Sequence, residues 1–325
     1  MNLYDRTIAR RRPWWVTMLI SLVLVLIPLG AITLDGAWGD IIRSGLWRPI
    51  LLGPVVIIYI LVVSQMMAKS SAAMLGAFRP LVGMDADGFD QLVRGVLRVR
   101  PAGEGIAILC STLIGFAMSL TTMQNIHTFW LRIYMPVAMG LMIGLLGWTI
   151  FGSFAETKLF TALHRQPLQM DILDIKSFEP VGRYSLVTAL AFVGGITLGV
   201  IFGLDVHNVL AWQTWLLFLP LMSVPVIVFF LNMGATHRLL ASEKKRQLRA
   251  VLEGIVRTSH ELQRRLGSGE RLGELAVEYT ALSAYEARLR AASTWPYNIA
   301  MLRTLSLTIF APVLVRGLSA VVFGW

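Results

Sequence analysis

Long blocks of apolar residues alternate with polar segments along the whole of this 325-residue chain. Each block covers about 20 residues, the length that an α-helix needs to cross the hydrocarbon core of a membrane. The pattern predicts an all-α, multi-pass membrane bundle of about seven transmembrane helices. They are expected near residues 14–34, 47–67, 104–122, 131–152, 185–204, 213–234 and 297–323.

A different pattern, with apolar residues three or four positions apart, runs through the polar segment 236–294. That spacing places the apolar side chains on one face of a helix. The sequence GSGE supplies a turn between two such stretches, which predicts a helical hairpin whose first arm continues the sixth transmembrane helix. The apolar positions are Leu248, Leu252, Ile255, Leu262 and Leu266, with Ser259 in one slot, and then Leu272, Leu275, Tyr279, Leu282 and Leu289.

The seam between this hairpin and the last apolar block carries the sequence STWPYNIAMLRT, residues 293–304. A residue before proline disfavours the helical conformation, so Trp295 is expected to end the second arm. Pro296 in a first helical turn loses no hydrogen bond, and Ser293 or Thr294 can cap the new helix. We therefore predict a hinge at Trp295 and Pro296.

Composition and charge support a membrane protein. The chain is 56% hydrophobic and 15% charged, whereas soluble domains carry roughly 25% charged residues. Of its 29 Lys and Arg, 24 lie in the N-terminal segment and in alternate loops, and positive charge stays on the cytoplasmic side. We expect a plasma-membrane protein with its N-terminus inside and its C-terminus outside. Its parts are a six-span bundle at 1–235, a cytoplasmic hairpin at 236–294 and a final transmembrane helix at 295–325.

The segment DGFDQLVRGVLRVRP, residues 87–101, predicts a short amphipathic helix after the second block. Its apolar residues share one helical face and arginines flank it, which is typical of a helix lying in the membrane interface. The apolar residues are Phe89, Leu92, Val93, Val96 and Leu97.

The sequence offers few candidates for catalytic, metal-binding or proton-carrying residues. Glu104, Glu156 and Asp205 lie at block ends, where solvation explains them, and the block interiors carry essentially no ionisable residue. The histidines show no metal-ligand spacing, and no hydrolase or nucleotide-binding motif occurs. We therefore expect no enzyme, no metal and no cofactor. The net charge of +10 fits an anionic membrane surface rather than nucleic acid.

The last block carries a polar stripe whose members recur every three or four residues. They are Thr304, Thr308, Pro312, Arg316 and Ser319. Such a face avoids lipid, so one interpretation is a water-lined path with Arg316 near its outer mouth. The other is that the threonines bond carbonyls one turn back and Pro312 kinks the helix.

Glycines repeat every four residues in two blocks, a pattern that lets helix backbones approach closely. They are Gly140 and Gly144 in the fourth block and Gly195, Gly199 and Gly203 in the fifth. We predict that they pack helices within one chain; the alternative is a seam between two copies of the chain.

The order of these parts resembles the topology of the insect odorant and gustatory receptor channels. The matching features are an inside N-terminus, seven spans, a sixth span that runs into the cytoplasm, a second inner helix and a broken start of the last span at Trp295 and Pro296. In that family the cytoplasmic hairpins assemble four subunits and the last span lines a cation pore. The resemblance implies that Thr304, Thr308 and Arg316 line or guard a pore, with 236–294 as the assembly region. The family's Thr-Tyr start and Gln-Phe end of the last span are absent here.

Two functions remain open from the sequence. The first is a homo-oligomeric channel or channel-like receptor whose last helix faces a central path. The second is a non-conducting membrane subunit or scaffold that docks a cytoplasmic protein partner through the hairpin at 236–294. In both cases the lipid bilayer is the solvent of the apolar blocks.

Overall fold

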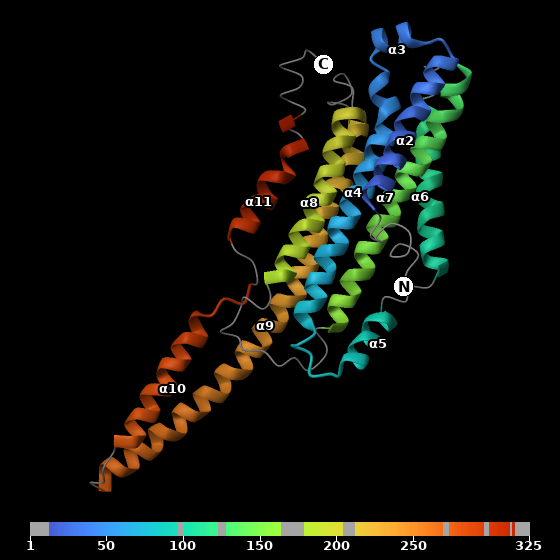
Figure 1. The fold of residues 1–325 in the computed structure, drawn as a ribbon. Coiled ribbons are helices and arrows are strands. Elements are labelled where there is room, and N and C mark those ends of the chain that lie inside the picture. Colours follow the sequence, from blue (N-terminus) through green and yellow to red (C-terminus); the bar gives the residue numbers. More distant parts are fainter. Residues whose placement is uncertain are drawn as a thin grey trace.

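The structure is a computed structural model, and it describes residues 13–96, 101–122, 128–163, 179–203, 212–268, 273–295, 299–312 and 314–315. The described chain is built from helices, so the predicted all-α fold is confirmed (Figure 1). The helices are α2 (Trp14–Leu34), α3 (Trp38–Ser44), α4 (Trp47–Phe78), α5 (Ala86–Val96), α6 (Pro101–Thr122), α7 (Phe129–Leu163), α8 (Glu179–Gly203), α9 (Trp212–Ser268), α10 (Gly273–Ala291) and α11 (Ile299–Ile309).

Among the residues that the structure describes, six helices are long and apolar enough to cross a membrane. The stretches are Trp14–Leu34, Trp47–Phe78, Ala102–Leu120, Phe129–Leu163, Glu179–Gly203 and Met222–Leu266. They correspond to the first six predicted blocks, so six of the predicted helices are confirmed as long and apolar enough to cross a membrane. Of the seventh block, 297–323, the structure describes α11 and the residues up to 312, together with 314–315.

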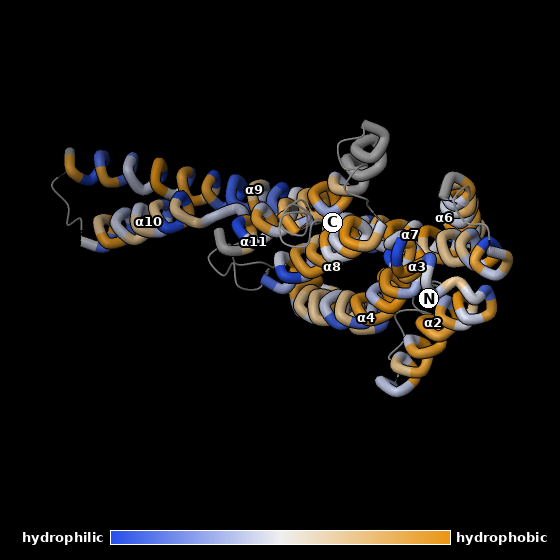
Figure 2. Tube along the Cα trace, turned by 90° about the horizontal axis from the view of Figure 1, so that it is seen from above, coloured by the Kyte–Doolittle hydropathy of each residue, from blue (hydrophilic) through white to orange (hydrophobic). Residues whose placement is uncertain are grey.

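The bundle is organised around α4, which packs against α2, α7 and α8 (Figures 1 and 2). Helix α6 packs along α7 at one side, and α8 separates α4 from α9. Helix α11 packs chiefly against α8. Helices α2 and α6 therefore lie at the periphery, where most of their apolar side chains remain exposed, as expected of helices that face lipid.

The end of the bundle away from the hairpin is closed by α3 and the turn before it. Asp35 follows α2, and its two carboxylate oxygens accept hydrogen bonds from the backbone amides of Trp130 and Leu131 at 3.1 and 3.0 Å. These amides belong to the first turn of α7 and have no partner within the helix. Asp35 thus caps α7 from another segment, and its negative charge complements the positive end of the helix dipole.

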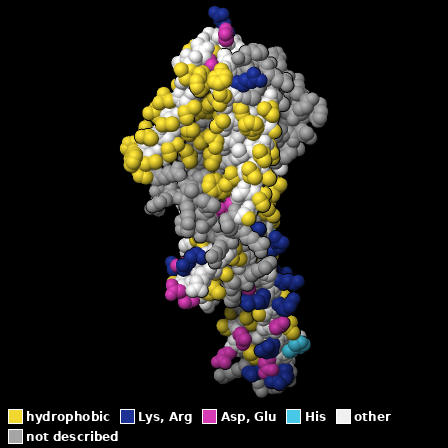
Figure 3. All heavy atoms as spheres, turned by 90° about the vertical axis from the view of Figure 1, so that its right-hand side faces the viewer, with side chains coloured by type: hydrophobic (Ala, Val, Ile, Leu, Met, Phe, Trp, Pro, Cys, Tyr) yellow, Lys and Arg dark blue, Asp and Glu magenta, His cyan; other side chains and the backbone are white. Residues whose placement is uncertain are grey.

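The predicted hairpin consists of the second half of α9 and the antiparallel α10, and it projects beyond the bundle (Figure 1). Helix α9 runs without a break through the sixth apolar block and the first arm, as the sequence predicts. In the view of Figure 3, hydrophobic side chains dominate the bundle surface, whereas charged side chains gather on the hairpin. The hairpin is therefore suited to water and the bundle to lipid.

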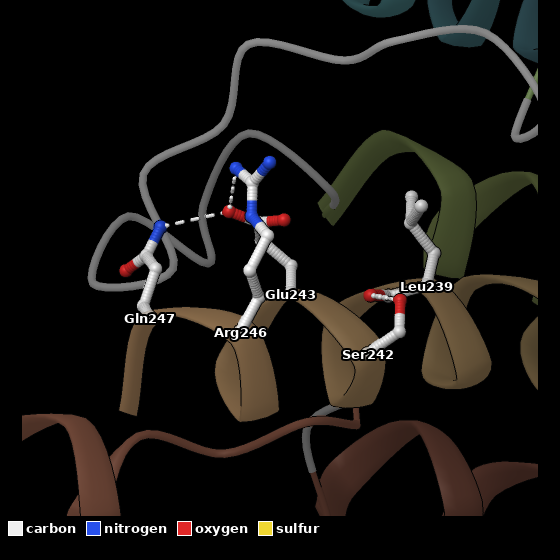
Figure 4. A network of polar contacts seen from close by, with 5 residues as sticks. All are labelled: Leu239, Ser242, Glu243, Arg246 and Gln247. Atoms are coloured by element: carbon white, nitrogen blue, oxygen red, sulfur yellow. Dashed lines mark hydrogen bonds and ion pairs between the residues drawn. The ribbon is translucent and has the colours of Figure 1, made fainter. Parts of the chain in front are cut away.

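Polar side chains pair with one another where α9 leaves the bundle (Figure 4). One carboxylate oxygen of Glu243 accepts hydrogen bonds from Arg246 at 2.5 Å and from Gln247 at 3.1 Å. The Ser242 hydroxyl donates to the carbonyl of Leu239 at 2.8 Å. Pairs three or four residues apart contribute only about 0.2–0.5 kcal/mol each to an exposed helix, so this network supports the helix locally.

The amphipathic segment forms α5, and its apolar face packs against protein. Phe89 is only 4% exposed, and Leu92, Val93 and Val96 contact the hydrophobic cluster at the hairpin end of the bundle. The periodicity predicted this helix correctly. Its apolar face packs against protein, and its position in the membrane interface stays a prediction. Helices α4 and α7 extend past their apolar blocks and offer α5 a protein surface.

Candidate functional site at the hairpin junction

Six helices meet in one hydrophobic cluster at the base of the hairpin, which we term the junction core. It joins α4, α5, α7, α8, α9 and α11, and Trp295 and Leu302 pack against it. Its buried members are Met74, Phe78, Val82, Phe89, Leu159, Leu163, Val181, Tyr184, Ala189, Phe229, Met233, Leu240 and Leu305. Any movement of the hairpin relative to α11 must therefore displace closely packed side chains.

The predicted hinge residue Trp295 is held by α9. Its indole stacks on the imidazole of His237, with ring centroids 3.9 Å apart and planes inclined by 9°. Nδ1 of His237 lies 3.1 Å from the carbonyl oxygen of Thr294. Because a carbonyl only accepts, Nδ1 must carry the proton in this contact. The same histidine thus binds the seam through a ring contact and a hydrogen bond, while Pro296 lies outside the described residues.

A lysine of α9 binds the end of α10. The ammonium group of Lys244 donates hydrogen bonds to the carbonyls of Arg290 and Ala292 at 2.7 and 2.6 Å. Carbonyls in the last turn of a helix lack partners within that helix, and a cation there also complements the negative end of the dipole. Lys244 therefore caps α10 and holds the seam beside α9.

Ser293, a predicted cap, bonds within the seam. Its hydroxyl oxygen accepts a hydrogen bond from the backbone amide of Trp295 at 3.2 Å. This is a local turn of the type that serine favours over a helix interior. The turn follows α10 at once and directs Trp295 back toward His237.

Two carboxylates of the bundle helices are shielded from solvent or bonded within the protein. The buried hydroxyl of Tyr184, on α8, donates a hydrogen bond to the carboxylate of Glu156 on α7. Glu104, on α6, is only 3% exposed, so the prediction that simple solvation explains it is wrong. Since α7 continues to Leu163, well past its apolar block, the start of α6 packs on helix rather than facing water.

A row of hydroxyl groups runs along α7 toward the junction, and the sequence analysis did not predict it. Thr149, Ser153, Thr157 and Thr161 each donate to the carbonyl four residues earlier, at 2.8 to 3.1 Å. Their four-residue spacing was a visible signal. Such bonds satisfy polar groups inside a membrane helix and often bend it.

The polar stripe of the last block is only partly described. Thr304 is exposed, Thr308 is half-buried and Pro312 is buried, whereas Arg316 and Ser319 lie outside the described residues. Because four residues advance a helix by about 400°, each repeat turns the stripe by about 40°. The stripe thus winds from the surface toward the bundle. The hydroxyl of Thr308 donates to the carbonyl of Thr304 at 2.5 Å, and α11 ends at Ile309, near the proline that cannot donate to Thr308.

The repeated glycines of α7 face a neighbouring helix of the same chain. A Cβ on Gly140 would meet Thr112 of α6 at 3.4 Å, and one on Gly144 would overlap the same side chain. A close approach to backbone lies nearby, where a Cβ on Gly115 would lie 2.5 Å from the carbonyl oxygen of Met139. Small residues thus allow α6 and α7 to pack tightly.

The glycines of α8 lie along α4. A Cβ on Gly195 would lie 3.6 Å from the ring of Tyr59, and one on Gly203 would lie 3.1 Å from Leu52. Gly199 is half-buried. The hydroxyl of Tyr59 donates to the carbonyl of Ala191 at 2.8 Å, which links α4 to α8 at the same level.

No protein-family model, curated protein or solved structure matches this chain. Within the part of the chain that the structure describes, no three His, Cys, Asp or Glu side chains lie close enough to hold a metal ion. The junction instead joins hairpin, bundle and last helix through a stacked ring pair, a lysine cap and a buried tyrosine–carboxylate pair.

Proposed function

We propose that this protein is a homo-oligomeric channel or channel-like receptor of the plasma membrane. In this proposal α11 belongs to a seventh transmembrane helix that faces a central path, the N-terminus lies inside the cell and the C-terminus outside. The hairpin assembles the subunits in the cytoplasm, and the junction transmits movement between hairpin and α11. The proposal is supported chiefly by an apolar stripe of α9 that its own partner helix leaves open.

Helix α10 covers the apolar stripe of α9 only in part, since Leu248, Ile255 and Leu262 are half-buried whereas Leu252 and Leu266 are exposed. The contacts across the hairpin come from Lys244, from Gly254, whose Cβ would meet Leu282 at 3.4 Å, and from Thr258, whose hydroxyl lies 3.5 Å from Glu278. Two members of the apolar stripe, Ile255 and Ser259, directly follow the contact residues Gly254 and Thr258 in the chain. One residue corresponds to about 100° around a helix, so the stripe lies beside the contact line rather than on it.

The stripe is open along one side of the hairpin. Leu252 is 37% and Leu266 is 60% exposed. Near the tip, Leu262 and Leu266 form one wall of a groove of about 300 Å³, and Ala276 and Tyr279 of α10 contribute to the other wall. Apolar residues at alternating four- and three-residue spacing form the seam of a coiled coil, so the stripe is suited to a further helix.

Charge favours a second copy of the hairpin as that further helix. Between Arg238 and Arg265, α9 carries eight Lys or Arg against three Glu, whereas α10 carries three Glu and no basic residue between Gly273 and Ala287. The acidic first part of α10 in one copy therefore complements the basic α9 of the next. Such a contact uses different surfaces on the two partners, and it closes into a ring when the rotation permits.

The exposed side chains of α11 support the proposal of an ion path between subunits. Because α11 packs chiefly on α8, Leu307, Phe310 and Leu314 are each more than 60% exposed. Thr304 is exposed beside this apolar face. In a ring of copies the apolar residues face lipid or the next subunit, and the threonine side turns toward the axis.

The second candidate is a non-conducting membrane subunit or scaffold whose hairpin docks a cytoplasmic protein. One observation favours it, since the Thr308 hydroxyl is already satisfied by its own helix and needs no water. The same open stripe of α9 then binds the partner protein instead of a second copy.

The mass of the purified protein in a mild detergent separates the two candidates. We expect an oligomer for the natural sequence and a monomer for Leu252→Glu, because the added charge cannot be buried in the seam. Ala250→Glu is the matched control, since Ala250 is also exposed on α9 but lies on another face. A monomeric natural protein, or proteoliposomes that pass no ions, would contradict the channel proposal.

A further inference from the structure

One face of α9 changes from apolar to basic where the helix leaves the bundle. Within the bundle this face carries Ile227 and Leu231, which are 46% and 43% exposed. Further along the helix it carries Arg238, Lys245 and Arg249, all of them exposed. In the view of Figure 3, Lys and Arg side chains likewise follow the hydrophobic surface of the bundle along the hairpin.

Helical geometry places these five residues on the same side of α9. The intervals between them are four, seven, seven and four residues. In a helix of 3.6 residues per turn, each interval returns a side chain to within about 40° of the one before. Because α9 runs through this region without a break, the side that faces lipid in a membrane is continuous with the basic side.

The first two basic residues of this face, Arg238 and Lys245, form no ion pair with a carboxylate among the described residues. Glu243 lies about 140–160° around the helix from them, where it is paired with Arg246 at 2.5 Å. The next carboxylate toward the tip, Glu253, lies about 12 Å beyond Lys245 along the axis. The charge of Arg238 and Lys245 is therefore available to an anion.

The long side chains of this face lean back toward the bundle. Side chains on an α-helix point toward its N-terminus, and the N-terminal half of α9 belongs to the bundle. Arg238 follows this rule, because its Nε donates a hydrogen bond to the carbonyl of Gly234 at 3.2 Å. Gly234 itself lies between Leu231 and Arg238, and a Cβ added there would meet no atom within 4 Å. The surface therefore has an open gap between its apolar part and its first guanidinium group.

We propose that this face of α9 binds an anionic phospholipid of the leaflet at the hairpin end of the bundle. The phosphate lies between Arg238 and Lys245, and a guanidinium group can hold two phosphate oxygens at once. The glycerol part lies over Gly234, and one acyl chain lies along Leu231 and Ile227. A zwitterionic headgroup carries a cation of its own, which the two basic residues repel. The proposal does not rest on subunit assembly, because it uses neither the groove near the hairpin tip nor α11.

The test is native mass spectrometry of the purified protein after exposure to equal amounts of phosphatidylglycerol and phosphatidylcholine. We expect the natural protein to retain phosphatidylglycerol preferentially. Arg238→Gln and Lys245→Gln each remove one charge, and each should weaken this retention about fivefold. Arg257→Gln is the matched control, because Arg257 is also exposed on α9 but lies about 18 Å beyond Lys245 toward the tip. It should retain the lipid as the natural protein does.

Unchanged retention in Arg238→Gln would overturn the proposal. An equal loss in Arg257→Gln would also overturn it, because net charge alone would then explain the retention. Equal retention of the two lipids, or equally tight binding of glycerol phosphate, which lacks acyl chains, would have the same consequence. Circular dichroism should be the same for all variants. The same spectra report the oligomeric mass, so a failure of assembly is distinguished from a failure of lipid binding.

Discussion

His237 lies face to face with Trp295, and this stacked pair fastens the start of the last helix to the helix that leaves the bundle. The two residues come from α9 and from the seam after α10. The adjoining hydrogen bond from His237 to the Thr294 carbonyl and the Lys244 cap hold the same seam. These contacts hold Trp295 against α9 in the described structure. In the channel proposal, their release would allow the hairpin to move α11.

Replacement of His237 should loosen the seam in two steps. His237→Phe retains the stacked ring and loses the hydrogen bond, which we expect to cost about 1 kcal/mol. His237→Ala loses both the hydrogen bond and the stacked ring contact. Loss of an aromatic pair costs a further amount of about 0.5–1.5 kcal/mol. Amide hydrogen exchange of residues 288–305 would measure the effect. Faster exchange in His237→Phe than in His237→Ala would contradict the ring contact.

Removal of the lysine cap should fray the end of α10. Lys244→Met keeps the length of the side chain and loses both hydrogen bonds to the last carbonyls, a loss of about 1–2 kcal/mol locally. Hydrogen exchange should rise at the end of α10 and at Ser293. Lys245→Met is the control, since Lys245 is exposed next to it and its replacement should leave exchange unchanged.

Two glycines of α6 should respond oppositely to a methyl group. In Gly115→Ala the new Cβ meets the Met139 carbonyl oxygen of α7, and overpacking costs about 1–3 kcal/mol. Gly105 has open space around it, so Gly105→Ala should be neutral or stabilise the helix by up to about 1 kcal/mol. Thermal unfolding in detergent measures both, and equal melting temperatures would contradict the close approach of α6 and α7.

Acid should weaken the hairpin near its tip. A hydrogen bond from Arg265, assisted by Arg264, lowers the pKa of the exposed Glu261 below its ordinary value. A carboxylate with a lowered folded-state pKa stabilises the fold above its unfolded pKa, and this contribution is lost as the pH falls through the folded value. Below about pH 4 we expect smaller amide protection factors (the intrinsic exchange rate at that pH divided by the observed rate) in residues 258–266, and Glu261→Gln should lack this pH response.

A bulky residue at Thr308 should change ion flux if α11 faces a path. Thr308→Phe narrows the proposed path and should reduce the flux through proteoliposomes severalfold. Leu307→Phe is the control, because Leu307 is 63% exposed on the apolar face of α11. Unchanged flux in Thr308→Phe would favour the non-conducting alternative.

Local pattern accounted for several features of the junction but not for its contacts. Periodicity predicted α5, α9 and α10. The proline rule predicted the end of the second arm at Trp295, whereas α10 ends earlier, at Ala291. No rule of spacing pairs Trp295 with His237, or Asp35 with the start of α7. These pairs depend on which helices become neighbours, and that is decided by packing between segments far apart in the chain.

The sequence by itself determined that the chain forms apolar helices able to cross a membrane, because the length and hydrophobicity of each block are local properties. It also determined that α9 extends into a polar hairpin. Only the tertiary structure decided which face of each helix is covered. It turned α10 toward Gly254 and Thr258 and left Leu252 open, and it buried Glu104. The reason is that rotation of a helix by one residue leaves its pattern intact while exchanging the side chains that meet a neighbour.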